Sequence, residues 1–207
     1  MIRIADMQPE HAPVVVKLHA QALSGDFLPN LGTPFLRVLY AGILDLNLGL
    51  GFVALDSDRV CGFVLGTFDS GTLFRRLLLA RGLRFAFAAL RPTLRRPALL
   101  PRFAETLLYP GKEGEVHVDA ELMVIAVADG YRGQGIGSQL VGRLNQAFAE
   151  RGVAEYKVTV HQDKPDSNRF YQQLGFQHRH TFTLYGKGWN LYTYHLSHPG
   201  GVEGAQR

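Results

Sequence analysis

The sequence contains a single cysteine, Cys61, so no disulfide bond can form within the chain. It also contains no apolar run long enough to cross a bilayer, and residues 1–10 lack the basic start and apolar stretch of a signal peptide. These absences exclude a disulfide-rich scaffold and predict a cytoplasmic protein. With 207 residues, of which 46% are hydrophobic and 19% charged, the chain can build a folded domain with a sizeable core.

Acidic residues are missing from one long segment. Residues 70–104 contain eight arginines and no Asp, Glu or Lys, whereas the whole chain has a net charge of only +4. The remainder of the chain is then net −4, so the positive charge is local and not a general nucleic-acid-binding surface. Because these arginines alternate with leucines and no reader motif accompanies them, no nucleic-acid partner is expected.

Apolar periodicity predicts a chain in which strands and helices alternate. Strands are expected over residues 1–5, within 51–69 as a pair around the turn at 56–58, over 115–128 and 155–161, and near 178–185 and 190–196. Helices are expected over 8–23, 34–46, 136–152 and 165–176, the second with Thr33 as its N-cap and the third ended by Gly152.

The arginine-rich segment interrupts this alternation. Residues 71–104 are expected to form two short helices broken at Pro92 and Pro97. No repeat or linker is apparent, so we predict one α/β domain over residues 1–198 with a helical insertion at about 70–112. Residues 199–207 are expected to form a flexible tail.

A glycine-rich turn, "YRGQGIGSQL" at residues 131–140, lies between a predicted strand and a predicted helix. The first backbone N–H groups of a helix lack partners within the helix and attract anions. Gly135 and Gly137 would let a phosphate approach these groups closely, while Arg132 adds a charged donor and Ser138 a hydroxyl. The turn therefore predicts a pyrophosphate-binding site.

Two familiar phosphate-binding motifs do not fit this turn. A P-loop is excluded because no Gly-Lys-Ser/Thr follows the glycines. A dinucleotide fingerprint would need Gly or Ala at position 138, where this chain has serine, and it usually marks a first strand–helix unit.

The spacing Arg132-x-x-Gly135-x-Gly137 resembles the acetyl-CoA signature Arg/Gln-x-x-Gly-x-Gly/Ala of the GNAT superfamily of acetyltransferases. Val127 stands five residues before Arg132, as the preceding strand of that family requires, and "NRFYQQLGF" at 168–176 resembles the family's Asn-x-Phe-Tyr…Gly-Phe segment. The resemblance is close over residues 115–185, whereas residues 1–69 agree only in the order of elements.

The resemblance implies a GNAT fold, a mixed and strongly twisted sheet of six to seven strands with helices on both faces. Strands 121–128 and 155–161 would splay apart to admit CoA. The implied cofactor contacts are Ile125, Ala126 and Val127 for the pantetheine arm, Arg132, Gly133, Gln134, Gly135, Ile136, Gly137 and Ser138 for the pyrophosphate, and Asn168 and Tyr171 beside them.

The implied reaction is acetyl transfer from acetyl-CoA to an amine, which needs a base near neutral pH. Glu121 matches the catalytic glutamate of histone-acetyltransferase-like members, and Tyr171 matches the tyrosine that protonates the leaving thiolate. Structural roles stay open for both: Glu121 as a solvated strand-end carboxylate, Tyr171 as a packing residue. Asp119 and His117 share the strand parity of Glu121 and are the next candidates.

Other chemically competent residues are given ordinary structural roles. Cys61 is expected in the core and His161 in a polar loop. His178 and His180 have metal-like spacing, but two ligands do not make a site, so no metal is expected.

The acceptor remains open at this level. We predict a small-molecule amine, with an amino sugar or nucleotide-linked sugar among the choices. The alternatives are a protein amine or hydroxyl, or a CoA-binding sensor without turnover. Three interpretations of the arginine-rich segment compete: a helical cap, a lid for an anionic acceptor, and an element that contacts a membrane surface through residues 71–104. A homodimer is also left open.

Overall fold

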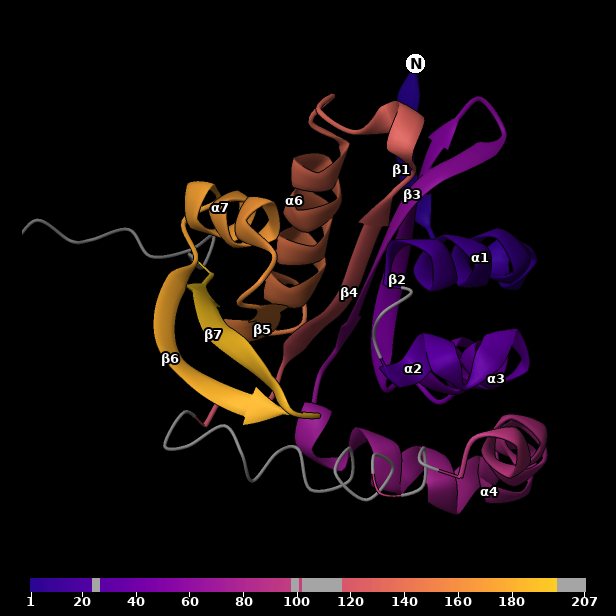
Figure 1. Cartoon of the computed structure of the whole chain (residues 1–207). Coiled ribbons are helices and arrows are strands. Elements are labelled where there is room, and N and C mark those ends of the chain that lie inside the picture. The colour runs from indigo at the N-terminus through magenta and orange to yellow at the C-terminus, as the bar shows by residue number, and fades with distance from the viewer. Residues whose placement is uncertain (24–26, 98–100, 102–116, 197–207) are drawn as a thin grey trace, which may run out of the picture.

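The computed structural model describes residues 1–23, 27–97, 101 and 117–196 (Figure 1). Seven strands form one sheet in the order β1-β2-β3-β4-β5-β7-β6. Their bounds are Ile2–Asp6 for β1, Gly49–Asp56 for β2, Arg59–Thr67 for β3, Glu121–Val127 for β4, Glu155–His161 for β5, Gln177–Leu184 for β6 and Lys187–His195 for β7. The mixed seven-stranded sheet confirms the fold class predicted from the sequence.

Helices cover both faces of the sheet (Figure 1). They are α1 Ala12–Ala22, α2 Phe27–Asn30, α3 Gly32–Asp45, α4 Ser70–Arg95, α6 Ile136–Ala149 and α7 Pro165–Gln173, with 3₁₀ turns η1 Pro9–His11 and η3 Asp129–Tyr131. On one face α1, α3 and α4 bury a core that includes Val15, Leu36, Leu77 and Phe63. On the other face α6 packs on the sheet through Leu140, Leu144 and Phe148.

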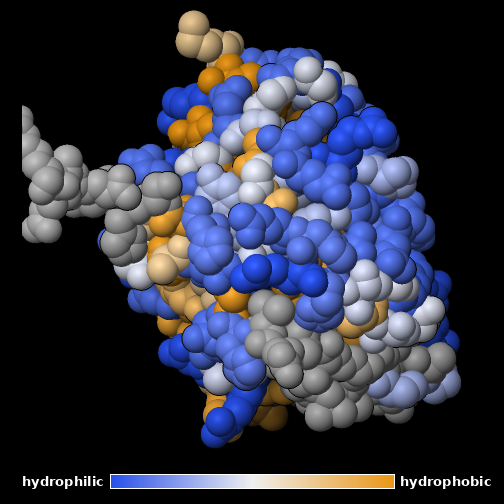
Figure 2. All heavy atoms as spheres, turned by 90° about the vertical axis from the view of Figure 1, so that its left-hand side faces the viewer, coloured by the Kyte–Doolittle hydropathy of each residue, from blue (hydrophilic) through white to orange (hydrophobic). Residues whose placement is uncertain are grey.

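The sheet ends at β6 on one side of the molecule. This edge strand exposes Gln177, His178, Arg179, Thr181 and Thr183. Figure 2, which views the molecule from that side, shows a largely hydrophilic surface. Polar side chains along an edge strand discourage pairing with another chain, so this face has the character of an ordinary solvated surface.

One parallel pair interrupts an otherwise antiparallel sheet. β4 and β5 are parallel and share a single register pair, Glu121 with Lys157. β3 and β4, by contrast, stay paired from Thr67–Glu121 to Gly62–Val127, with a register shift between Leu65 and Gly66. The two parallel strands therefore part just beyond Glu121, which confirms the splay implied by the sequence resemblance.

The start of α3 differs from the sequence prediction. The expected N-cap, Thr33, lies inside α3, whose N-cap is Leu31, and no side chain caps this helix. The helix begins earlier because the α2 turn leads into it almost directly, so Thr33 sits in the first turn. This prediction was wrong by two residues.

The described part of this segment does contain two helical stretches, but the break between them is not at Pro92. They form α4, Ser70–Arg95, which contains Pro92 and is kinked instead at Arg81. Arg81 has non-helical dihedral angles, φ −139° and ψ 22°, and its guanidinium donates to the Asp45 carboxylate at 2.7 Å. Pro92 lies in the last turn of α4 without breaking it, and Pro97 follows the helix end. The rest of the predicted insertion, 98–100 and 102–112, lies outside the described residues, as does the predicted tail.

The strand expected over 115–128 is shorter than predicted. β4 begins at Glu121; residues 117–120 are not in a strand, and 115–116 lie outside the described part. The carbonyl of Asp119 accepts from the Ser70 N–H at 2.8 Å, which ties this segment to the start of α4. The parity argument that made Asp119 and His117 reserve candidates is therefore wrong, because parity holds only within a strand.

Candidate active site

A cavity of about 1010 Å³ opens where β4 and β5 part. It runs along β4 from Glu121 to Val127 and along β5 from Val158 to His161, and it reaches the glycine-rich turn before α6. The sequence-predicted residues that line it are Glu121, Ile125, Ala126, Val127, Arg132, Gly133, Gly135, Ile136, Gly137, Ser138 and Tyr171. The fold thus brings most of the predicted site into one space.

The free edge of β4 faces this cavity. The N–H of Ala128 donates to Cys61 of β3 at 2.8 Å, so alternate residues before it, Ala126 among them, direct their backbone groups toward β3. The backbone N–H and C=O groups of Ile125 and Val127 then point to the other side of β4, toward the space where β5 is no longer paired with it. An extended ligand in the gap could bond to these groups as an added strand.

The glycine-rich turn places a helix N-terminus at one end of the cavity. Gly133 and Gly135 adopt φ of +76° and +75°, which residues with a side chain rarely adopt. A Cβ atom built on either glycine would meet nothing within 4 Å, so the space beside the turn is open. Gly135 is also the N-cap of α6, whose first N–H groups lack partners within the helix. The turn therefore forms an open cradle suited to an anion.

Arg132 stands beside this cradle and is 61% exposed. Its Nε donates to the Val127 carbonyl at 3.2 Å, and its Nη2 pairs with Asp129 at 2.9 Å. The ion pair is exposed and weak, so the guanidinium can exchange Asp129 for a phosphate at little cost. Gln134, predicted beside it, is not among the lining residues; its amide donates to the Gly130 carbonyl at 3.3 Å.

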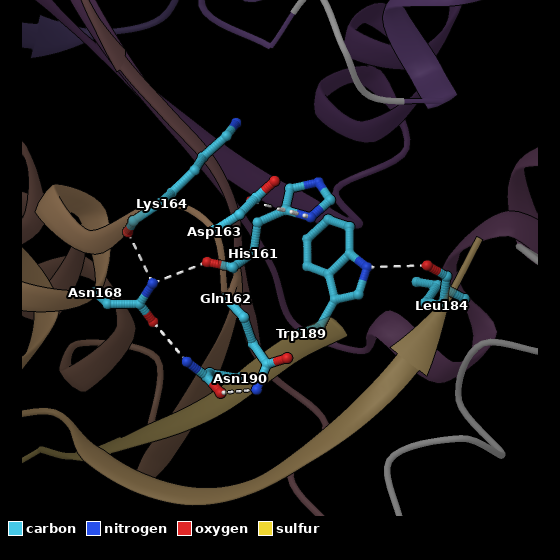
Figure 3. A network of polar contacts seen from close by, with 8 residues as sticks. All are labelled: His161, Gln162, Asp163, Lys164, Asn168, Leu184, Trp189 and Asn190. Atoms are coloured by element: carbon cyan, nitrogen blue, oxygen red, sulfur yellow. Dashed lines mark hydrogen bonds and ion pairs between the residues drawn. The ribbon is translucent and has the colours of Figure 1, made fainter. Parts of the chain in front are cut away.

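Asn168 does not line the cavity, contrary to its expected cofactor contact. Its amide nitrogen donates to the carbonyls of His161 and Lys164 at 2.8 and 2.7 Å (Figure 3). Its oxygen accepts from Asn190 and from the Tyr192 hydroxyl, both at 2.8 Å. An amide has two donors and two acceptor sites, and all four are used here. In this structure Asn168 fixes the loop after β5 to α7 and β7, and its contact with the cofactor stays a prediction.

Tyr171 lies on α7 and lines the cavity, with its ring buried. The ring packs edge-on against Phe176, with centroids 5.1 Å apart. Among the residues that the structure describes, its hydroxyl has no hydrogen-bond partner. Burial raises the pKa of this hydroxyl well above the ordinary tyrosine value of 10.0. The phenol therefore stays protonated over the whole neutral range and is available as a donor toward the cavity.

Glu121 is a buried carboxylate at the point where β4 and β5 part. It stands in register with Thr67 on one side and Lys157 on the other, and both neighbours are also buried. Residues in register on adjacent strands share a face of the sheet, so the Lys157 side chain lies on the same face as that of Glu121. Glu121 therefore combines access to the cavity with a basic residue in register on the neighbouring strand.

The wall of the cavity that faces Glu121 is mainly apolar and aromatic. Helices α1 to α4 and their connections contribute His19, Ala22, Leu23, Phe27, Leu28, Pro29, Leu39, Tyr40, Ser70, Leu73 and Phe74. The β6–β7 turn closes it, since Tyr185 packs on Phe27 with ring centroids 5.3 Å apart. This wall has few polar groups. Nδ1 of His19 lies 2.8 Å from the Tyr40 hydroxyl, and the Ser70 hydroxyl is buried with no partner among the described residues.

A second, smaller cavity of about 180 Å³ adjoins this wall. It lies between α3 and α4, and its lining is entirely apolar: Phe27, Leu28, Phe35, Phe74, Leu77, Leu78, Gly82, Phe85, Ala86 and Ala89. Phe27, Leu28 and Phe74 line both cavities, so the apolar surface continues from the catalytic opening toward the kink of α4.

Sequence reasoning missed His161 and Trp189. His161 is not in a loop; it is the buried last residue of β5 and lines the cavity. Its ring stacks on Trp189 of β7 with centroids 3.7 Å apart, and the indole N–H donates to the Leu184 carbonyl at 3.1 Å (Figure 3). The signal that could have found His161 is its place at the carboxyl end of a strand beside the splay, where open sheets bind ligands.

Comparison with known proteins is consistent with this arrangement. The family model described as "Acetyltransferase (GNAT) family" matches residues 20–176. No curated protein matches the chain significantly. In sequence terms the similar solved structures are distant, at 14–16% identity for the three described next.

The first of these structures is an N-acetyltransferase from Staphylococcus aureus Mu50, with 16% identity, a TM-score of 0.62, and coverage of 95% of this chain and 99% of that one. Ard1 from Thermoplasma volcanium has 14% identity and a TM-score of 0.61, covering 95% and 98%. The ribosomal-protein-S18-alanine N-acetyltransferase from Escherichia coli has 14% identity and a TM-score of 0.55, covering 98% of both chains. At such identities these likenesses show the shared fold.

Proposed function

The chain belongs to the GNAT family of acetyltransferases, and from this premise we propose that it transfers an acetyl group from acetyl-CoA to the amine of a small molecule with an apolar or aromatic body. The proposal rests on the cavity that opens between β4 and β5 beyond the Glu121–Lys157 pair. An anion-binding helix N-terminus lies at one end of that opening, and an apolar wall faces Glu121.

The donor side of the cavity supports acetyl-CoA as the cosubstrate. The open space beside Gly133 and Gly135 suits a pyrophosphate, which the α6 N-terminus and Arg132 would hold. The edge of β4 at Ile125 and Val127 suits the amide groups of the pantetheine arm. With these groups to hold its pyrophosphate, acetyl-CoA would need no metal ion for binding. Within the described ranges, no group of three or more His, Cys, Asp or Glu side chains is arranged to hold one.

The thioester of acetyl-CoA supplies the acetyl group, and the residues of this chain move the protons. Glu121 accepts the proton that the attacking amine loses. Tyr171 donates a proton, or at least a hydrogen bond, to the departing sulfur, and its raised pKa keeps it in the protonated form for that role. A backbone N–H on the free edge of β4 polarises the carbonyl as an oxyanion-type donor. Rate is gained chiefly by holding both substrates in one cavity.

The lining of the acceptor wall favours an apolar acceptor over an amino sugar. A sugar ring would need a hydrogen-bond partner for each hydroxyl, because polar groups buried without partners are costly. The wall offers mainly Leu, Phe and Tyr side chains, with His19 and Tyr40 already bonded to each other. An aliphatic or aromatic amine would bury its body there and direct its nitrogen toward Glu121.

A peptide amine is the second candidate. It is favoured by the likeness to the Escherichia coli enzyme, whose name states that it acetylates the alanine of a ribosomal protein. A CoA-binding sensor without turnover is disfavoured, because a sensor has no need of Tyr171 and Glu121 in the same cavity.

The proposal is tested by thiol release from acetyl-CoA over a panel of acceptors. The panel contains aliphatic and arylalkyl amines, amino sugars, nucleotide-linked sugars, polyamines and peptides with free N-termini. We expect the highest kcat/KM among the aliphatic and arylalkyl amines. Faster turnover of amino sugars or peptides would overturn the acceptor class, while tight acetyl-CoA binding with no release on any acceptor would overturn the enzyme reaction.

Arg132→Ala should weaken acetyl-CoA binding by about tenfold or more, because it removes a charge-assisted bond to phosphate. At saturating acetyl-CoA, kcat should stay nearly unchanged, since Arg132 is exposed and remote from Glu121 in the fold. Isothermal titration with acetyl-CoA measures the first effect. Arg3→Ala on the exposed edge of β1 is the matched control. An Arg132→Ala protein of unaltered affinity would show that the pyrophosphate lies elsewhere.

A further inference from the structure

Four large apolar side chains project into solvent from one side of α4. Leu83, Phe87, Leu90 and Leu94 follow one another at intervals of four, three and four residues, which aligns them along one side of a helix. They are 79%, 76%, 53% and 75% exposed. Single exposed leucines are common on protein surfaces, whereas an aligned row of this kind usually marks a contact surface.

The opposite side of the same helix is anchored in the protein. Phe85 is buried and packs on Phe35 with ring centroids 5.2 Å apart. A residue two positions along a helix lies about 200° around its axis, so Leu83 and Phe87 point away from the direction of Phe85. The packing of α4 on α3 therefore fixes the apolar row outward.

Arginines flank this row. Arg84, Arg91 and Arg95 are all exposed and follow one another at intervals of seven and four residues, which places them along one flank. The described part of the segment, residues 70–97, contains seven arginines and no acidic residue. Together the apolar row and these three arginines form the outer face of α4.

Two chemical requirements select the partner of this face. It must accept apolar side chains and supply negative charge beside them. Nucleic acid would satisfy the arginines but not the row of leucines, and a second copy of this chain would bring like charges together. An anionic bilayer offers acyl chains and negatively charged headgroups at the depths where an interfacial helix places its two kinds of residue.

We propose that the outer face of α4 docks this protein onto the surface of an anionic lipid bilayer. The contact is peripheral: in the described ranges no helix is both long and apolar enough to cross a membrane. In Figure 1, α4 lies at one end of the molecule, beyond α2 and α3, so its outer face can approach a flat surface.

The docked orientation has a consequence for the catalytic cavity. The first turns of α4 carry Ser70, Leu73 and Phe74, which line the acceptor wall. Docking would therefore bring that wall close to the bilayer, where amphipathic amines partition. This consequence rests on the proposed acceptor class, whereas the docking itself is independent of any activity.

The test is co-sedimentation of the full chain with vesicles. We expect binding to equimolar phosphatidylglycerol–phosphatidylcholine vesicles, weak binding to phosphatidylcholine alone, and a loss of binding as NaCl rises toward about 0.5 M. The double variant Leu83→Ser/Phe87→Ser should have an affinity for the anionic vesicles that is lower than that of the parent chain by roughly tenfold or more. Arg84→Gln/Arg91→Gln/Arg95→Gln should lose most of the preference for the anionic lipid.

The matched control is Val14→Ser/Lys17→Gln, which removes an exposed apolar and a basic side chain from α1 and should bind like the parent chain. Acetyl-CoA affinity and the melting temperature verify that each variant is folded. The proposal fails if anionic vesicles do not bind the parent chain, or if both α4 variants bind as well as it does. It also fails if light scattering shows a dimer that only the apolar variant dissociates, since the row would then join two copies.

Discussion

Replacing Tyr171 by phenylalanine should lower kcat by about 10²- to 10³-fold while leaving the affinity for acetyl-CoA nearly unchanged. The substitution removes only the hydroxyl, and that hydroxyl has no hydrogen-bond partner among the described residues. The ring would keep its packing against Phe176. The loss therefore isolates the proton or hydrogen bond that the leaving sulfur requires.

The measurement is steady-state thiol release combined with titration of acetyl-CoA. Because burial raises the pKa of Tyr171, the parent enzyme should show no alkaline loss of kcat from this group below the ordinary tyrosine value of 10.0. Tyr156→Phe is the matched control: Tyr156 is also buried, but its hydroxyl donates to Asn145 and the residue does not line the cavity. If Tyr171→Phe and Tyr156→Phe lost activity equally, the acid role of Tyr171 would be refuted.

Replacing Glu121 by glutamine should lower kcat/KM at neutral pH by about 10²-fold, because an amide cannot accept the proton of the amine. The loss should shrink as the pH rises toward the amine pKa of about 10.4, since more of the acceptor is then already neutral. A kcat/KM–pH profile of both proteins measures this convergence. A merely structural role would reduce activity by the same factor at every pH.

Asp119→Asn is the control for this experiment. Asp119 is another carboxylate close in sequence, but it precedes the strand and does not line the cavity. It should keep nearly full activity. Because Glu121 is buried beside Lys157, the melting temperature of Glu121→Gln must also be measured. A folded Glu121→Gln protein with a kcat/KM within about threefold of the parent would remove Glu121 as the base.

Much of the proposed acetyl-CoA site could be predicted from the sequence, because its features depend on residues that are close together in the chain. The φ angles of Gly133 and Gly135, the helix start at Ile136 and the charge of Arg132 are all encoded within a few residues. The splay of β4 and β5 was implied by the family resemblance, and the structure places its start just beyond Glu121. Local motifs do not reveal partners that come from elsewhere in the chain. The motif that contains Asn168 does not show that Asn190 and Tyr192 of β7 bond to its oxygen.

The arginine-rich segment shows the same limit. Proline positions predicted a break at Pro92, but the kink is at Arg81, where Asp45 of α3 provides an ion pair. Leu77 also packs so closely on α3 that a Cβ atom at Gly42 would lie 2.6 Å from its side chain. Composition alone could not choose among a cap, a lid and a membrane element, because it does not say which side of the helix is anchored.

The sequence by itself determined the family, the order of strands and helices, and the glycine-rich turn before α6, since these depend on periodicity and on residues close together in the chain. Only the tertiary structure decided the acceptor wall. Phe27 of α2, Phe74 of α4 and Tyr185 after β6 reach one cavity because the sheet and its helices bring distant segments together. It likewise decided which face of α4 is buried by Phe85 and which faces solvent. Burial depends on neighbours across the fold, and no local pattern records them.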